Sequence, residues 1–473
     1  MTRRWTLLTA MAGTAVALGV GLRSSAQPIA PAATLCARFP AAASSMYRPG
    51  TPAPHWRTDY PASTGTAVHA WEAIDFKSDW RAYMTAVLSE VQAAGLMIQN
   101  NNLAMNNNAQ WWIAPWMDYG PFGREARLGL TKERGPDAGD LSPTSQPGAQ
   151  VWAIGFYNQE GAKALGEIFA DPCNPTRPAG GWTFPAKAVS FKLLFTTASP
   201  TQVNYLSQSP TVAAFIDPDG SAAGSVSVGD REVQTLRLIQ MDIAVRDPRA
   251  PQGWVFGTFV WQNNQSGLYG DLTPVGLSWS NDPGASAATL SSFATLPSTR
   301  LNEELAGILW QGDTAWPQRP WPGFEGRLNG PADNFRSSCL SCHGLAQWPR
   351  SKRLGLLPRP AADYTLQMLS SATRRDQLRT TWMKDVPGGT LMDPSEAATA
   401  AGWGGAISLD YSLQLEASFT RMCGACANGA LTGPTPAVCK IEGIPSRVTA
   451  ANCPAPRAAL GIQSTGEVEP PRQ

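Results

Sequence analysis

The chain has 473 residues, of which 43% are hydrophobic and 15% charged, so it is long enough for two or three domains with cores of their own. Its 37 Lys and Arg residues balance 36 Asp and Glu residues, with no basic run, which argues against a nucleic-acid-binding protein. The 44 Gly, 40 Pro and 18 Trp residues indicate a turn-rich, β-rich globular protein rather than a helical bundle or a disordered chain. Eight Cys residues against three His residues restrict the kinds of metal site that the chain can form.

The first segment has the pattern of an export signal. Arg3 and Arg4 precede an apolar run, and small residues at 24–26 suit cleavage after Ala26. The residues after the arginine pair lack the usual twin-arginine continuation, so we expect residues 1–26 to be a Sec signal peptide. The alternative is an uncleaved membrane anchor. We therefore predict a periplasmic or otherwise extracytoplasmic protein with no membrane span after cleavage, in which disulfides can form.

Periodicity predicts one helix followed by several strands. Residues 78–94 have apolar side chains at helical spacing, and Gly95 follows as a stop. Strands are expected in four short apolar runs, which lie at residues 151–158, 189–197, 235–247 and 254–262. The third run alternates, with Met241 and Ile243 on one face and Gln240 and Asp242 on the other. The loop between the last two runs makes a hairpin the simplest pairing.

The sequence at residues 339–343 reads Cys-Leu-Ser-Cys-His, which is the spacing of a c-type haem attachment site. Two thiols one helical turn apart can each add to a haem vinyl group, and the adjacent His can ligate the iron. A redox dithiol and half of a zinc site are the alternatives. Both fit less well, because the next cysteine is the distant Cys423 and no βαβ pattern surrounds the motif. The motif predicts one covalent haem c on Cys339 and Cys342, with His343 as an iron ligand.

The chain around this motif resembles class I c-type cytochromes over residues 326–428. Residues 331–338 can form the short helix before the attachment site, with Phe335 as an inward aromatic residue. A helix at 371–385 runs into Pro-Gly-Gly-Thr-Leu-Met at 387–392, which is similar to the Pro-Gly-Thr-Lys-Met stretch of the family apart from one extra Gly and Leu in place of Lys. Residues 411–422 would form the closing helix.

The resemblance implies an axial methionine, and Met392 is the expected sixth ligand of the iron because it ends an extended stretch after a helix. Met383 is the second choice, with Met368 and Met422 less suitably placed. The alternative is that Met392 only caps a loop and the iron is open or ligated by a His from the N-terminal part. A methionine ligand closes the iron to small molecules and favours electron transfer over catalysis.

Together these patterns predict an α+β multidomain fold. An extended lead-in at 27–65 precedes an N-terminal β-rich, sandwich-like domain with a few helices at 66–300, for which we recognise no family. A Pro/Trp-rich connector at 301–325 leads to the small all-α cytochrome c-like domain at 326–428. A Cys/Pro-rich tail occupies 429–473.

Six further cysteines remain, an even number that predicts up to three disulfides in an exported protein. Proximity favours bridges among Cys423, Cys426, Cys439 and Cys453, with Cys36 bound to Cys173. The alternative is a redox-active dithiol at 423 and 426. A second haem is not expected there, because Ala427 stands where a ligating His would be needed.

Other candidate sites are weaker. Trp111 and Trp112 begin an aromatic and charged cluster that could line a ligand pocket or form the edge of a core, and we prefer the core. The cluster continues with Trp116, Asp118, Tyr119, Arg124 and Glu125. His55 and His69 are expected to be surface or core residues rather than iron ligands. Arg350, Lys352 and Arg353 could meet haem propionates or an acidic partner, although a solvated face explains them equally well.

Three functions from different classes follow from these features. The favoured one is an electron-transfer protein that exchanges electrons with a redox partner protein, with the β-rich domain as a docking or ligand-binding module. The second is a haem-dependent oxidoreductase with its substrate site in or beside that domain. The third is an extracytoplasmic binding or sensor protein with a structural haem and a small-molecule ligand. No dinucleotide fingerprint, zinc motif or Gly-x-Ser-x-Gly elbow is present, so no independent catalytic cofactor is visible and the catalytic residues are unassigned.

Overall fold

The computed structural model describes the chain from residue 56 to residue 453 with gaps. The described ranges are 56–106, 108–115, 130–136, 141–142, 148–171, 174–216, 232–263, 268–283, 285, 296–305, 323–334, 337–349, 372–392, 405–427, 433–440 and 452–453. Its α-helices are α2 (Trp80–Ala93), α3 (Gln159–Ile168), α5 (Cys339–His343), α7 (Ala372–Trp382) and α8 (Leu413–Ala427). Short 3-10 helices lie at Ala70–Ala73, Asn204–Leu206, Glu303–Leu305, Phe324–Gly326 and Ala437–Lys440.

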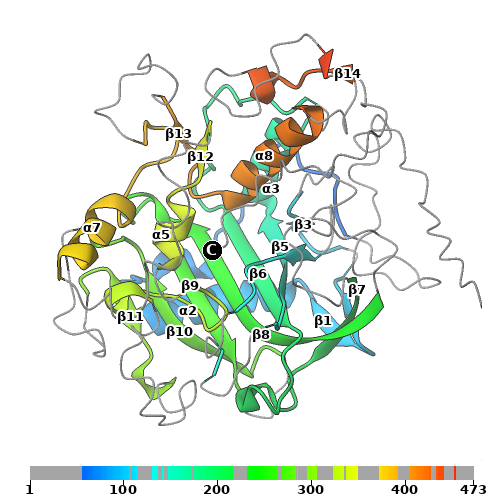
Figure 1. Ribbon diagram of the computed structural model, residues 1–473, viewed down its shortest axis with the longest axis vertical. Coiled ribbons are helices and arrows are strands. Elements are labelled where there is room, and N and C mark those ends of the chain that lie inside the picture. Colours follow the sequence, from blue (N-terminus) through cyan, green and yellow to red (C-terminus); the bar gives the residue numbers. More distant parts are fainter. Residues whose placement is uncertain are drawn as a thin grey trace, which may run out of the picture.

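A nine-stranded antiparallel sheet is the centre of the described structure (Figure 1). Its strands are β3 (Trp111–Ile113), β4 (Thr131–Lys132), β5 (Val151–Asn158), β6 (Val189–Thr196), β7 (Thr211–Ile216), β8 (Glu232–Arg246), β9 (Trp254–Trp261), β10 (Leu272–Ser278) and β11 (Thr299–Leu301). The order is β11-β10-β9-β8-β6-β5-β3, with β4 also on β5 and β7 also on β8. Three further pairs are β1 (Met97–Gln99) with β2 (Asn102–Ala104), β12 (Gln347–Trp348) with β13 (Ile407–Ser408), and β14 (Gly433–Pro434) with β15 (Asn452–Cys453).

The four predicted strands are confirmed as β5, β6, β8 and β9, and β8 and β9 form the expected antiparallel hairpin. The long strand β8 pairs with β6 along most of its length and with β7 at its start. Its alternation is also confirmed over residues 241–244, because Met241 and Ile243 are buried whereas Asp242 and Ala244, which each follow one of them, are half-buried. The two faces of this strand therefore meet different surroundings.

The apolar face of the sheet packs against α2, which Figure 1 shows behind the strands. Asp79 caps the start of this helix by accepting a hydrogen bond from the backbone N–H of Ala82. Tyr83 and Met84 are fully buried, and a Cβ added to Gly257 of β9 would lie 3.0 Å from the Met84 Cε atom. A side chain at residue 257 would also lie 2.9 Å from the Cγ1 atom of Ile243, so Ile243 and Met84 would have to shift to admit it.

The sandwich expected for residues 66–300 is not what the structure shows. A sandwich needs a second sheet on the inner face, but α2 covers that face, and the other sheets of the described residues have only two strands each. The fold is a mixed one, a large antiparallel sheet with a few helices. The helices expected at 78–94, 371–385 and 411–422 are present as α2, α7 and α8.

A separate all-α domain over 326–428 is likewise not shown. Leu340 of α5 and Leu415 and Phe419 of α8 belong to the same hydrophobic cluster as the sheet. Arg327 is fully buried and donates hydrogen bonds to the carbonyl oxygens of Asn281 and Asp282 at 2.7 and 2.8 Å. Residues after the expected connector at 301–325 therefore pack into the same core as residues before it.

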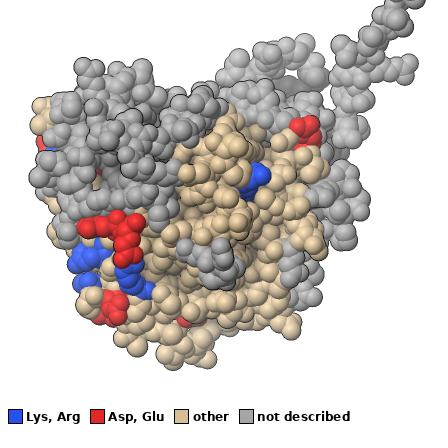
Figure 2. All heavy atoms as spheres, turned by 90° about the horizontal axis from the view of Figure 1, so that it is seen from below, with Lys and Arg blue, Asp and Glu red and all other residues tan. Residues whose placement is uncertain are grey.

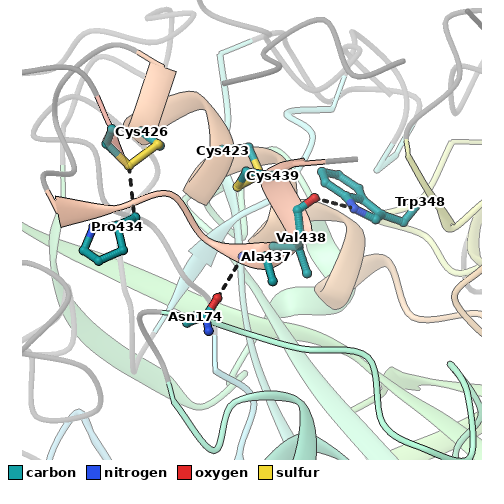
Figure 3. Close-up of a disulfide and its surroundings, with 9 residues drawn as sticks. Asn174, Trp348, Cys423, Cys426, Pro434, Ala437, Val438 and Cys439 are labelled. Carbon is teal, nitrogen blue, oxygen red and sulfur yellow. Dashed lines mark hydrogen bonds between the residues drawn. A yellow bond between two sulfur atoms is a disulfide. The ribbon is translucent and has the colours of Figure 1, made fainter. Parts of the chain in front are cut away.

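Two disulfides fasten the C-terminal segments to α8 (Figure 3). Cys423 is bonded to Cys439, and Cys426 to Cys453, which confirms bridges among the last four cysteines. The alternative of a dithiol at 423 and 426 does not hold, because each of these cysteines has a different partner. Trp348 of β12 adds a hydrogen bond from its indole N–H to the carbonyl oxygen of Val438 at 3.1 Å. Cys36 and Cys173 lie outside the described residues.

Charged side chains are sparse among the described residues of the face shown in Figure 2. The face in Figure 2 shows acidic and basic side chains mixed in one group beside a broad uncharged area, with no single-sign patch among the described residues of that face. No helix in the described ranges is both long enough and apolar enough to cross a bilayer.

Peptide mapping under non-reducing conditions tests the pairing. We expect peptides that link 423 to 439 and 426 to 453, and none that links 423 to 426. The bonded cysteines are 16 and 27 residues apart, so each bridge should raise the free energy of unfolding by roughly 3 kcal/mol through loss of chain entropy in the unfolded state. A Cys426→Ser/Cys453→Ser variant with an unchanged denaturation midpoint would contradict the assignment. The same map tests whether Cys36 pairs with Cys173.

Candidate functional site

The C-x-x-C-H motif forms α5, a single turn of helix that starts at the first cysteine and ends at the histidine. Ser338 caps it, since its side chain accepts a hydrogen bond from the Ser341 N–H at 3.0 Å while the Ser341 hydroxyl accepts from the Ser338 N–H at 2.8 Å. Leu340 and Ser341 point into the protein and are buried. The helix expected at 331–338 is absent from its described part, since residues 331–333 form a turn.

Cys339 and Cys342 are not bonded to each other or to another cysteine. Both are half-buried, and burial raises the pKa of the Cys342 thiol to about 11 and that of Cys339 well above its usual range. Such thiols are protonated at neutral pH, which is unlike the low-pKa thiolate of a redox-active dithiol.

One ring nitrogen of His343 is hydrogen-bonded to the backbone. Its Nδ1 lies 2.9 Å from the carbonyl oxygen of Tyr411, and a carbonyl can only accept, so Nδ1 carries the proton and Nε2 has the free lone pair. Burial lowers the pKa of this imidazole to about 4, so it is neutral at pH 7. Its ring centroid is 4.8 Å from that of Phe256 of β9. A neutral imidazole with a fixed tautomer is the form that ligates a metal.

The position of the Tyr411 carbonyl depends on Asp410. Both residues have positive φ angles, 52° for Asp410 and 65° for Tyr411, a conformation that costs a non-glycine residue free energy. The buried Asp410 carboxylate holds this turn by accepting hydrogen bonds from the Trp254 indole at 2.9 Å and the Phe184 backbone at 2.7 Å. Arg246 of β8 lies 3.4 Å from the same carboxylate. The central sheet thus fixes the hydrogen-bond partner of His343.

A group of charged side chains lies on the same face of the sheet as Phe256. Lys192, Asp242 and Thr258 are side by side on β6, β8 and β9. The Thr258 hydroxyl donates to the Asp242 carboxylate at 2.9 Å and lies 3.7 Å from the sulfur of Cys339. The sheet therefore meets α5 through a polar contact at Cys339 as well as through the ring of Phe256.

The loop before α5 brings a second carboxylate to this face. The Gln240 side-chain N–H group donates to Asp242 at 2.8 Å and to Asp333 at 2.9 Å, so one amide joins the two acids. Burial and the neighbouring Asp333 raise the pKa of Asp242 to about 7, and burial raises that of Asp333. A Cβ added to Gly330 would lie 2.2 Å from Gln240, so this close approach requires glycine. We call Asp242 and Asp333 the carboxylate pair.

Several positions on the sheet face beside α5 are partly exposed. Positions in the middle of a wide sheet are normally buried, yet Ser190, Lys192, Asp242 and Ala244 are only half-buried. Gly155 of β5 pairs with Lys192 and so extends this row to the next strand. A Cβ added to Gly155 would make no contact shorter than 3.6 Å. Cys339, Cys342 and His343 are also half-buried. The small side chains on this face of the sheet and the reactive residues of α5 are therefore partly accessible.

The expected sixth ligand lies in an apolar setting. Met392 is buried in a small cluster with Leu345, Val386 and Ala406. Its backbone N–H donates to the Ala406 carbonyl oxygen at 2.9 Å, and Leu391 bridges to Ile407. The extended stretch expected before Met392 is wrong for residues 387–390, which form a turn closed by a hydrogen bond from the Thr390 N–H to the Pro387 carbonyl oxygen, with Gly389 at a φ of 74°. Met383 and Met422 are also buried. Met368 lies outside the described residues.

The structure explains two of the weaker candidates as structural residues. Trp111 and Trp112 are buried in β3, which agrees with the core interpretation, and Arg57 stacks over the Trp112 ring at 4.1 Å. His69 lies 3.0 Å from Glu90 and stacks on Trp71, so it joins α2 to the preceding segment. The remaining candidates are outside the described residues: His55, Trp116, Asp118, Tyr119, Arg124, Glu125, Phe335, Arg350, Lys352 and Arg353.

Comparison with protein-family models, with curated proteins and with solved structures found no match. Among the residues that the structure describes, no group of three or more His, Cys, Asp or Glu side chains is arranged to hold a metal ion. The features of the described residues that bear on function are therefore α5 and its surroundings.

Sequence reasoning missed the carboxylate pair and the Asp410 support. Alternation along β8 places Gln240 and Asp242 on one face, but nothing in that pattern predicts Asp333 as their neighbour. For Asp410, the only sequence signal is an acid next to the closing helix, and its partners Phe184 and Trp254 are distant in the chain.

Replacing Asp410 by Ala tests the support of His343. The change leaves the buried Trp254 and Phe184 N–H groups and Arg246 without their acceptor, so we expect the free energy of unfolding to fall by about 3–5 kcal/mol. The control is Asp59→Ala, which removes an exposed carboxylate paired with Arg57 at 2.8 Å and should cost about 0–1 kcal/mol. Urea titration measures both, and equal costs would contradict a supporting role for Asp410.

Proposed function

We propose that this protein is an exported monohaem c-type cytochrome that transfers electrons through a haem bound covalently to Cys339 and Cys342. The observation that carries the proposal is the condition of the three motif residues in α5. Its two cysteines are unpaired, and its histidine keeps Nε2 free because Nδ1 is bound to the Tyr411 carbonyl oxygen. A motif that occurred by chance would not need a half-buried, tautomer-fixed histidine one residue after an unpaired cysteine.

Each residue of the site has a defined task in this proposal. Cys339 and Cys342 hold the haem by thioether bonds, and His343 ligates the iron through Nε2. The Tyr411 carbonyl keeps the imidazole oriented, as outer partners of ligating histidines generally do. The partly exposed row on β6 and β8 provides space for the macrocycle. When bound, the haem supplies an iron that takes up and returns one electron.

Cell compartment and partner follow from the same proposal. Haem attachment through C-x-x-C-H takes place outside the cytoplasm, and the two disulfides among the described residues are compatible with such a compartment. We propose a periplasmic or other extracytoplasmic location and a redox partner protein that delivers or accepts the electron.

The attachment is tested by purifying the mature protein from a periplasm that carries haem-attachment machinery. An alkaline pyridine haemochrome spectrum and the intact mass should indicate one haem per chain. Cys339→Ser or Cys342→Ser should reduce stable attachment at least tenfold. Cys423→Ser/Cys439→Ser also removes two sulfur atoms but leaves α5 intact, so its haem content should match that of the wild type. A folded wild type without haem would refute the proposal.

The sixth ligand decides between electron transfer and catalysis. With Met392 as the ligand, the ferric protein should show the weak long-wavelength absorption band of His/Met haems, and Met392→Ala should abolish it. Met383→Ala, which truncates another buried methionine, should retain the band. Survival of the band in Met392→Ala would refute this ligand. Absence of the band in the wild type would favour the haem-dependent oxidoreductase, because an open iron can react with small molecules.

A further inference from the structure

The carboxylate pair has no task in the proposed cytochrome, although it lies beside the attachment helix. Asp242 is linked to the sulfur of Cys339 through the Thr258 hydroxyl, which is 2.9 Å from the carboxylate and 3.7 Å from the sulfur. Asp333 is joined to Asp242 by the amide of Gln240. A haem held by Cys339 would therefore have two half-buried carboxyl groups close to its attached edge.

The charges around the pair do not neutralise it. Lys192 of β6 faces Asp242 across the strands, but its ammonium group also lies 3.7 Å from Glu133, which follows β4. Lys192 is thus one cation that acts on three acids, while α5 contributes the neutral thiol of Cys339. Arg134 adds a second positive charge, which acts on Cys342. Two adjacent, half-buried carboxylates repel each other, so such a pair tends to keep one proton between them.

We propose that the carboxylate pair binds a proton from solvent when the haem takes up an electron, so that this protein couples electron transfer to proton transfer. The inference rests on the proposed cytochrome function and adds a proton-binding site to it. In the reduction, one electron passes from the redox partner to the iron, and one O–H bond forms on an Asp242 or Asp333 oxygen. On oxidation the electron leaves to the acceptor and the proton returns to solvent.

The sign of the coupling follows from electrostatics. A negative charge near the iron stabilises the ferric state, and protonation of the pair removes that charge. The midpoint potential is therefore higher at low pH and lower at high pH. A tenfold change in proton concentration shifts it by up to about 59 mV, the one-electron equivalent of a tenfold change in an equilibrium constant.

The experiment is a spectroelectrochemical titration of the intact haem protein over a series of pH values. The midpoint potential of the wild type should fall as pH rises through neutrality. Asp242→Asn and Asp333→Asn should each flatten this dependence and raise the potential at alkaline pH, because one carboxylate charge is lost and the remaining acid ionises at lower pH. A slope that survives in both variants overturns the proposal and assigns the proton to another group, such as a haem propionate.

Asp247→Asn is the matched control. Asp247 follows the last residue of β8, and its carboxylate accepts a hydrogen bond from Tyr83 of α2 on the opposite face of the sheet. From Asp242 to the end of the strand at Arg246, ~3.3 Å per residue already separates the Cα atoms by roughly 13 Å. This variant loses the same charge and should keep the wild-type slope. Loss of the slope in Asp247→Asn as well would show a general charge effect and refute a specific role for the pair.

Infrared difference spectroscopy of the wild type tests the proposal without a variant. The spectrum of the reduced minus the oxidised protein at neutral pH should contain a positive band from the C=O stretch of a protonated carboxyl group. Absence of that band in a protein shown to bind haem overturns the proton site but leaves the cytochrome assignment intact. A mature protein without haem overturns both.

Discussion

The hydrogen bond between His343 Nδ1 and the Tyr411 carbonyl oxygen is the interaction on which the whole site depends. It fixes the tautomer of the imidazole and leaves Nε2 as the only ring nitrogen able to ligate a metal. The carbonyl is held in turn by a strained pair of residues, and the strain persists because Asp410 is fastened to Trp254 and Phe184. The hydrogen bonds that keep the Tyr411 carbonyl in place, and so orient the histidine, therefore involve residues far from α5 in the sequence.

The central sheet serves two purposes through its two faces. One face is apolar, packs against α2 and supplies the stability of the fold. The other carries Lys192, Asp242 and Thr258 in one row and meets the cysteines of α5 through polar contacts. Because strand residues alternate between the faces, β8 can belong to the core and to the site at the same time. A cofactor held on the second face would sense the charges of the strands beneath it.

Local patterns predicted much of this structure. Apolar runs predicted β5, β6 and β9, helical spacing predicted α2, and the spacing of Cys339, Cys342 and His343 identified the candidate site. What failed depends on contacts between distant segments. The sandwich and the separate helical domain are not shown, because α2, not a second sheet, covers the apolar face, and because Arg327 and Leu340 join the core of the preceding residues. Asp333 meets Asp242 only after the chain returns to the sheet, so no local signal exists for that pair.

The central claim is that α5 holds a haem whose iron is ligated by His343 in the orientation set by Tyr411. An X-ray structure of the mature protein, with anomalous data collected at the iron edge, tests this most directly. We predict one iron peak at the Nε2 atom of His343, continuous density from both sulfur atoms of α5 to the macrocycle, and an intact hydrogen bond from Nδ1 to the Tyr411 carbonyl oxygen. A Cys339–Cys342 disulfide, or iron bound away from His343, would contradict the account.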